Sequence, residues 1–146
     1  MNKNIVLGIA LFGVAMTASA SDNPCGQLNI SIYNKSGHAC QLENYDLKGG
    51  QFLYGQVPQT IKNNEVASKF TISQDDKTAP RIVLKYICEN KNFIIESSQP
   101  WCSIFGGAGA VSGIVQHSDN VQVSYTTIDG SYLHSTAGQI DWHIGG

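Results

Sequence analysis

Residues 81–97 read RIVLKYICENKNFIIES, and this stretch decides the fold of the chain. Its first part, residues 81–88, is the most apolar and β-branched segment of the protein. The polar residues 89–92 follow, and an apolar pattern resumes at residues 93–97. Two such segments separated by a short polar turn are typical of a β-hairpin. We therefore predict that residues 81–88 form a central strand and that residues 93–97 return beside it.

Further strands are predicted on both sides of this hairpin. Residues 28–33 alternate apolar and polar side chains, which is the period-2 pattern of a half-buried strand. Other candidate strands are residues 40–47, 69–72, 111–116, 121–128 and 139–144. No window of the mature chain carries an apolar helical stripe with caps. Short strands at roughly 8–12-residue spacing indicate an antiparallel sandwich or barrel. We predict an all-β fold, a single antiparallel β-sandwich domain over residues 21–146. The sequence pattern alone does not distinguish this sandwich from a β-barrel.

The first twenty residues are predicted to be an export signal rather than part of the domain. Lys3 provides the basic start, residues 5–16 are apolar, and Ala18-Ser19-Ala20 fits an A-x-A cleavage site. A membrane-spanning helix needs about 20 apolar residues, so this stretch is too short for one. We therefore expect an exported protein, either secreted or periplasmic, without a transmembrane segment.

The charge of the exported part excludes one class of partner. Residues 21–146 hold 8 basic residues against 11 acidic ones, a net charge of −3, and the basic residues form no cluster. Nucleic-acid binding requires a basic patch, so a nucleic-acid partner is not expected. Adsorption to anionic lipid by charge alone is disfavoured for the same reason.

Four cysteines, an even number, all lie in the exported part: Cys25, Cys40, Cys88 and Cys102. In an oxidising compartment they predict two disulfides, for which three connectivities are possible. We favour Cys25–Cys40 and Cys88–Cys102, because each closes a loop of about 15 residues, worth about 3 kcal/mol. The spacings contain no C-x-x-C pair, which argues against a zinc site. No metal and no cofactor are predicted.

The sequence lacks the patterns expected of common catalytic sites. The four histidines show no metal-binding spacing and are read as scattered surface residues: His38, His117, His134 and His143. There is no G-x-S-x-G elbow and no phosphate-binding loop, and the carboxylates are too sparse to support the acid pair of a glycosidase. We therefore predict a protein that is not an enzyme.

Aromatic residues are the remaining candidates for a functional surface. Pro100, Trp101 and Phe105 lie in a segment with little charge, next to a Gly-rich run at residues 106–110. Trp and Tyr suit a membrane interface because they combine an apolar body with a polar tip. Packing in the core is the alternative for Trp101, and it is the expected role of Trp142 in the last strand. Tyr54 completes the predicted set of lipid- or partner-binding residues.

The spaced pattern of the mature chain resembles the aegerolysins, which are small β-sandwich proteins. The resemblance rests on Ile32-Tyr33-Asn34-Lys35-Ser36-Gly37, on the stretch at residues 42–51, on the two strands of the hairpin, on Gln99-Pro100-Trp101 and on the closing segment at residues 129–144. It implies recognition of membrane lipid, often of the sphingolipid type, and in some members action with a second, pore-forming protein. Of the family's aromatic lipid contacts, only Pro100-Trp101 is carried over, and Gly49 stands where the family often has Trp.

Together these features predict a secreted, non-enzymatic, aegerolysin-like protein that recognises membrane lipid and contributes to cytolysis with a pore-forming partner protein. The alternative is a periplasmic or extracellular protein-binding module, such as an inhibitor, an immunity protein or an adhesin-like domain. In that case the same aromatic surface would contact a protein.

Overall fold

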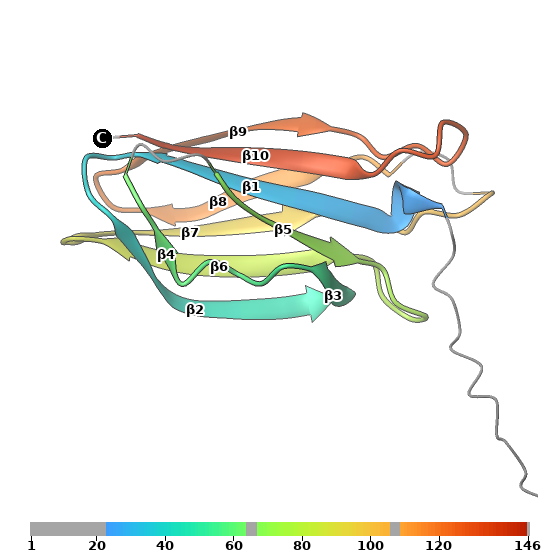
Figure 1. Cartoon of the computed structure of the whole chain (residues 1–146), viewed down its shortest axis with the longest axis horizontal. Helices are drawn as coiled ribbons and strands as arrows, with labels where there is room; N and C mark the ends of the chain where they lie inside the picture. Colours follow the sequence, from blue (N-terminus) through green and yellow to red (C-terminus); the bar gives the residue numbers. More distant parts are fainter. Residues whose placement is uncertain (1–22, 64–66, 106–108, 146) are drawn as a thin grey trace, which may run out of the picture.

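The structure, a computed structural model, describes residues 23–63, 67–105 and 109–145. These residues form two five-stranded sheets packed face to face, so the predicted β-sandwich is confirmed (Figure 1). Residues 1–20, predicted as the export signal, lie outside the described residues.

A short 3-10 helix, η1 (Pro24–Gly26), precedes the strands. The first sheet, here sheet A, has the order β3-β5-β1-β10-β9. Its members are β1 (Gln27–Lys35), β3 (Gln51–Tyr54), β5 (Ser68–Ser73), β9 (Gln122–Ile128) and β10 (Gly138–Gly145). Sheet B has the order β4-β2-β6-β7-β8. It consists of β2 (Cys40–Gly49), β4 (Thr60–Ile61), β6 (Arg81–Cys88), β7 (Lys91–Ser98) and β8 (Ser112–Ser118).

The predicted hairpin is present as β6 and β7, and it lies at the centre of sheet B. Its turn is tighter than expected, because Cys88 pairs directly with Lys91 and only Glu89 and Asn90 remain between the strands. Two strands were not predicted, β3 and β4. Both are short strands at sheet edges, and burial on one face is too limited there to leave a clear alternation in the sequence.

One pair of strands departs from a purely antiparallel arrangement. β1 runs parallel to β10, from Leu28 opposite Gly138 to Lys35 opposite Gly145. The first and last strands therefore lie side by side in the middle of sheet A, as Figure 1 shows in blue and red. A parallel pair needs a long connection, and here the whole of sheet B lies between the two strands in sequence.

The core fills the space between the inner faces of the two sheets. Alternate residues of the central strands are fully buried, among them Leu28, Ile30 and Ile32 of β1 and Ile82, Leu84 and Tyr86 of β6. Trp142 is also fully buried, as predicted. Its indole nitrogen donates a 2.9 Å hydrogen bond to the Ser97 hydroxyl, which links β10 of sheet A to β7 of sheet B. The buried indole donor is thus satisfied.

The predicted disulfide connectivity is wrong. Cys25 is bonded to Cys102, and Cys40 is bonded to Cys88. Cys25 and Cys40 lie at opposite ends of β1, a nine-residue strand that spans roughly 30 Å, whereas a disulfide needs Cα atoms within about 7 Å. Cys88 and Cys102 are likewise separated by the length of β7. Closeness in sequence misled the prediction because a full strand intervenes in each case.

The observed disulfides have different positions in the fold. Cys40 and Cys88 face each other on the neighbouring strands β2 and β6, with Cα atoms 4.0 Å apart. Cys25, by contrast, precedes β1 of sheet A, and Cys102 lies in the loop after β7 of sheet B. The Cys25–Cys102 bond therefore connects the two sheets at one end of the sandwich. Both bonds indicate an oxidising compartment.

Replacing both Cys25 and Cys102 by Ser is expected to lower the free energy of unfolding by about 4 kcal/mol, because the bond closes a loop with a sequence separation of 77. Urea unfolding of the variant and of the wild type measures this loss. The matched control, Cys40→Ser with Cys88→Ser, removes a bond of separation 48 and should lose a similar amount. Only the first variant should speed amide exchange at residues 99–105. Peptide mapping of the native protein that recovered a Cys25–Cys40 bond would refute the pairing.

Candidate functional site

The loop after β7 and the loop before β10 meet at one end of the sandwich, here called the loop end (Figure 1). The first comprises residues 99–111, of which residues 106–108 of the Gly-rich run lie outside the described residues. The second comprises residues 129–137. The Gly130 amide donates to the Gly109 carbonyl at 3.2 Å, and the Val111 amide donates to the Asp129 carboxylate at 2.8 Å. These bonds tie the two loops together.

The start of the described chain reinforces the same end. Cys25 of η1 carries the disulfide to Cys102, and the Asn23 side chain donates to the Tyr132 carbonyl at 2.9 Å. One segment thus contacts both loops, which are far apart in sequence. The described parts of both loops are consequently tied to η1 and to each other, although they lie outside the two sheets.

Two glutamine side chains position the loop after β7. Gln74 bonds both backbone groups of Cys102: its amide nitrogen donates to the carbonyl at 3.0 Å, and its oxygen accepts from the N–H at 2.9 Å. Gln99 is buried and donates to the Cys25 carbonyl. These two side chains therefore satisfy backbone groups on both sides of the Cys25–Cys102 disulfide.

Four large apolar side chains are exposed on these loops, and we call them the apolar loop tips. Phe105 is 96% exposed, Leu133 90%, Ile104 64% and Trp101 40%. Pro100 is exposed beside them. The prediction named Pro100, Trp101 and Phe105, and the core-packing alternative for Trp101 does not hold. It missed Ile104 and Leu133, although a leucine in a turn-rich segment was a signal that could have been used.

The charge of the loops is low. Residues 99–111 and 129–137 contain no Lys or Arg, and Asp129 is their only acidic residue. One oxygen of the Asp129 carboxylate accepts the bond from the Val111 amide. The apolar loop tips therefore form a surface that can bind by removal of apolar area from water, with little contribution from charge.

Tyr54 does not join this surface. It is 66% exposed, but it lies on the edge strand β3, where it pairs with Thr71 of β5. Its strand neighbour Phe52 packs edge-to-face on Tyr45, with ring centroids 5.8 Å apart. The structure therefore separates Tyr54 from the three other residues predicted with it.

The histidines occupy separate positions in the fold. His38 pairs with Glu89 at 3.0 Å, Nδ1 of His134 lies 3.0 Å from the Ser131 hydroxyl, and His143 stacks on Tyr33 with ring centroids 5.1 Å apart. Within the described ranges, no three His, Cys, Asp or Glu side chains come close enough together to hold a metal ion. The same part of the chain contains no helix long and apolar enough to cross a membrane.

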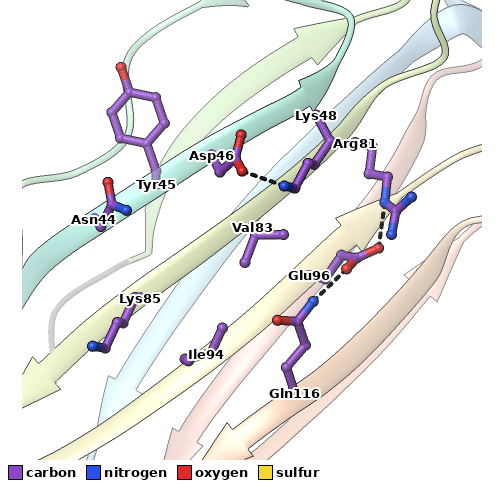
Figure 2. A pocket seen from close by; sticks show the side chains of 10 residues that line it. All are labelled: Asn44, Tyr45, Asp46, Lys48, Arg81, Val83, Lys85, Ile94, Glu96 and Gln116. Carbon is purple, nitrogen blue, oxygen red and sulfur yellow. Dashed lines mark hydrogen bonds and ion pairs between the residues drawn. The ribbon is translucent and has the colours of Figure 1, made fainter.

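A second feature is a hollow of about 370 Å³ on the outer face of sheet B, shown in Figure 2. Side chains of β2, β6, β7 and β8 line it. Glu96 of β7 points outward yet is only 4% exposed, because Arg81 and Gln116 cover it. The bond to Glu96 raises the pKa of Arg81 above its ordinary value, so this guanidinium stays charged. Sequence reasoning missed the hollow entirely.

The comparisons with known proteins give a fold and no family. No protein-family model and no curated protein matches the chain. The lipid-binding protein Nakanori aligns with a TM-score of 0.60 at 12% identity, covering 81% of this chain and 70% of that one. IP-1A from Alcaligenes faecalis aligns with a TM-score of 0.56 at 17% identity, covering 85% of this chain and 93% of that one. The RahU protein in complex with TRIS aligns with a TM-score of 0.60 at 9% identity, covering 84% of this chain and 96% of that one. The chain shares its sandwich fold with these proteins.

The Gln74→Ala substitution tests how the loop end is held. It leaves both backbone groups of Cys102 without their partner, so the free energy of unfolding should fall by about 1–3 kcal/mol. Amide exchange at Cys102 should become faster. Asp76→Ala, an exposed position in the same connection, is the control and should change neither quantity. Equal exchange rates at Cys102 in the two variants would contradict this account.

Proposed function

We propose that the protein is an exported, non-enzymatic, aegerolysin-like protein that binds membrane lipid through its loop end. The observation that carries the proposal is the exposure of Phe105, Leu133, Ile104 and Trp101 on two loops that a disulfide and hydrogen bonds tie to the fold and to each other. Burying an apolar side chain of this size is worth about 1.5–3 kcal/mol, so a soluble protein gains nothing by leaving four of them in water at one end. Such clusters mark surfaces that bind partners or membranes.

The geometry suits shallow insertion into a bilayer. The tips lie on the loops that follow β7 and β9, and insertion of about 5–10 Å would place them at the boundary between headgroups and acyl chains. Trp101, which is partly exposed, would then lie at the depth that indole rings favour. The disulfide and the bonds of Gln74 hold the backbone at Cys102 before binding, which reduces the ordering cost of association.

Other observations support the proposal at a coarser level. Nakanori, which shares the fold, is a lipid-binding protein. The two disulfides fit action outside the cytoplasm, in agreement with the export signal inferred at residues 1–20. The aegerolysin resemblance extends the proposal to cytolysis together with a separate pore-forming protein.

Phe105→Ala and Leu133→Ala should each weaken binding to vesicles about tenfold or more, because each removes an apolar side chain that would leave water on insertion. Flotation with vesicles of phosphatidylcholine, sphingomyelin and cholesterol measures the change. The matched control is Ile87→Ala, an exposed apolar residue at the opposite end of β6 from the loops. This variant should bind as the wild type does.

Salt provides an independent check on the same binding. Because residues 99–111 and 129–137 contain no Lys or Arg, the affinity for vesicles should be nearly constant between about 50 and 500 mM salt. No binding to any of these vesicles, or equal losses in Phe105→Ala and Ile87→Ala, would reject lipid binding by the loop end. A stoichiometric protein partner lost in Phe105→Ala, without lipid binding, would favour the protein-binding alternative instead.

A further inference from the structure

We infer that the hollow on the outer face of sheet B is a second binding site and that its ligand is a neutral saccharide. The hollow lies on the central strands of sheet B, so its floor is rigid. It involves none of the apolar loop tips, and its volume of about 370 Å³ falls at the small end of ligand sites. The inference is independent of lipid binding.

The hollow has an apolar floor and a polar rim (Figure 2). Val83 and Ile94, both half-buried, form the floor between β6 and β7. On one side of the floor lie Asp46 and Lys48, and on the other lies the group Arg81, Glu96 and Gln116. A sugar ring has the matching character, since its C–H groups are apolar and its hydroxyls project from the edge.

Glu96 fixes the polar groups on one side of the rim. One carboxylate oxygen accepts from Arg81 Nε at 2.6 Å, and the other accepts from Gln116 Nε2 at 2.6 Å. Among the described residues, this leaves the Nη groups of Arg81 and the side-chain oxygen of Gln116 for a ligand. A planar donor group and an acceptor are thus held in place before the ligand arrives, which lowers the ordering cost of binding.

The charges around the hollow favour a neutral ligand over an anion. Each cation already has a carboxylate partner: Lys48 pairs with Asp46 at 2.5 Å, Arg81 with Glu96 at 2.6 Å and Lys85 with Glu43 at 2.7 Å. A phosphate group would have to compete with these carboxylates. A hydroxyl both donates and accepts, so vicinal hydroxyls can bond to a carboxylate and its neighbouring cation together without separating them.

The test uses the purified, oxidised protein and the methyl glycosides of glucose, galactose, mannose and N-acetylglucosamine, followed by amide chemical shifts in NMR titrations. At least one glycoside should shift residues 44–48, 81–85 and 94–96, with a dissociation constant on the order of 1 mM or below. Asp46→Ala and Lys85→Ala should each weaken that binding at least about fivefold, a change of about 1 kcal/mol. The control Lys91→Ala removes a positive charge from sheet B, as Lys85→Ala does, but outside the hollow, and it should bind as the wild type does.

Two further arms separate the alternatives. Phe105→Ala should bind the glycoside unchanged, so failure of lipid binding and failure of this site are distinguishable. Phosphocholine titrated alone should leave the hollow residues unshifted. Absence of a shift with every glycoside, shifts outside the hollow, or shifts produced by phosphocholine and by none of the glycosides would each overturn the inference. Asp46→Ala and Lys85→Ala binding as tightly as Lys91→Ala would overturn it too.

Discussion

The Cys25–Cys102 disulfide is the constraint on which the arrangement of the loop end depends. It joins the segment before β1 of sheet A to the loop after β7 of sheet B, and the hydrogen bonds of Gln74 and Gln99 form around it. Without this bond, the loop with Trp101 and Phe105 would be held to the rest of the fold by hydrogen bonds alone, among them those of Gln74 to Cys102 and of Gly130 to Gly109. The covalent link fixes the backbone at Cys102, directly after Trp101, whose side chain is 40% exposed.

The loop end and the hollow on sheet B differ in the interactions that they offer a ligand. The loop end offers apolar area, has no Lys or Arg and is held by a disulfide and by two glutamine side chains. The outer face of sheet B offers a floor of Val83 and Ile94 surrounded by balanced ion pairs. The first surface would gain free energy by leaving water, and the second by exchanging water for directed hydrogen bonds. The rigid sandwich between them keeps the two sites apart.

The strands of the core were predictable because burial on one face leaves a period of two in residues such as Leu28 to Tyr33. The short edge strands β3 and β4 show no such alternation in the sequence. The disulfides were predicted from proximity in sequence, whereas the pairing is decided by which strand ends meet in space. The parallel pairing of β1 with β10 depends on the topology of the whole chain, so no local sequence pattern predicts it.

The residues of the candidate sites also divide into some that the sequence pattern predicts and others that it does not. Phe105 and Trp101 could be found because large apolar residues in a turn-rich, uncharged segment are poorly explained by a core. Leu133 carried the same signal and was overlooked. Glu96 could not be found, because an acidic residue at an outward position of a strand is ordinarily solvated. Only the register of β6, β7 and β8 shows that Arg81 and Gln116 enclose it.

The direction of the chain has a practical consequence. The described chain begins at Asn23, which bonds to Tyr132 beside the apolar loop tips, whereas β10 runs away from the loops and ends at Gly145, at the opposite end of the sandwich (Figure 1). A tag or fluorophore attached ahead of Asn23 would crowd the loop end. One attached after Gly145 would leave it clear, so the protein can be immobilised by its C-terminus with every copy presenting its loops outward.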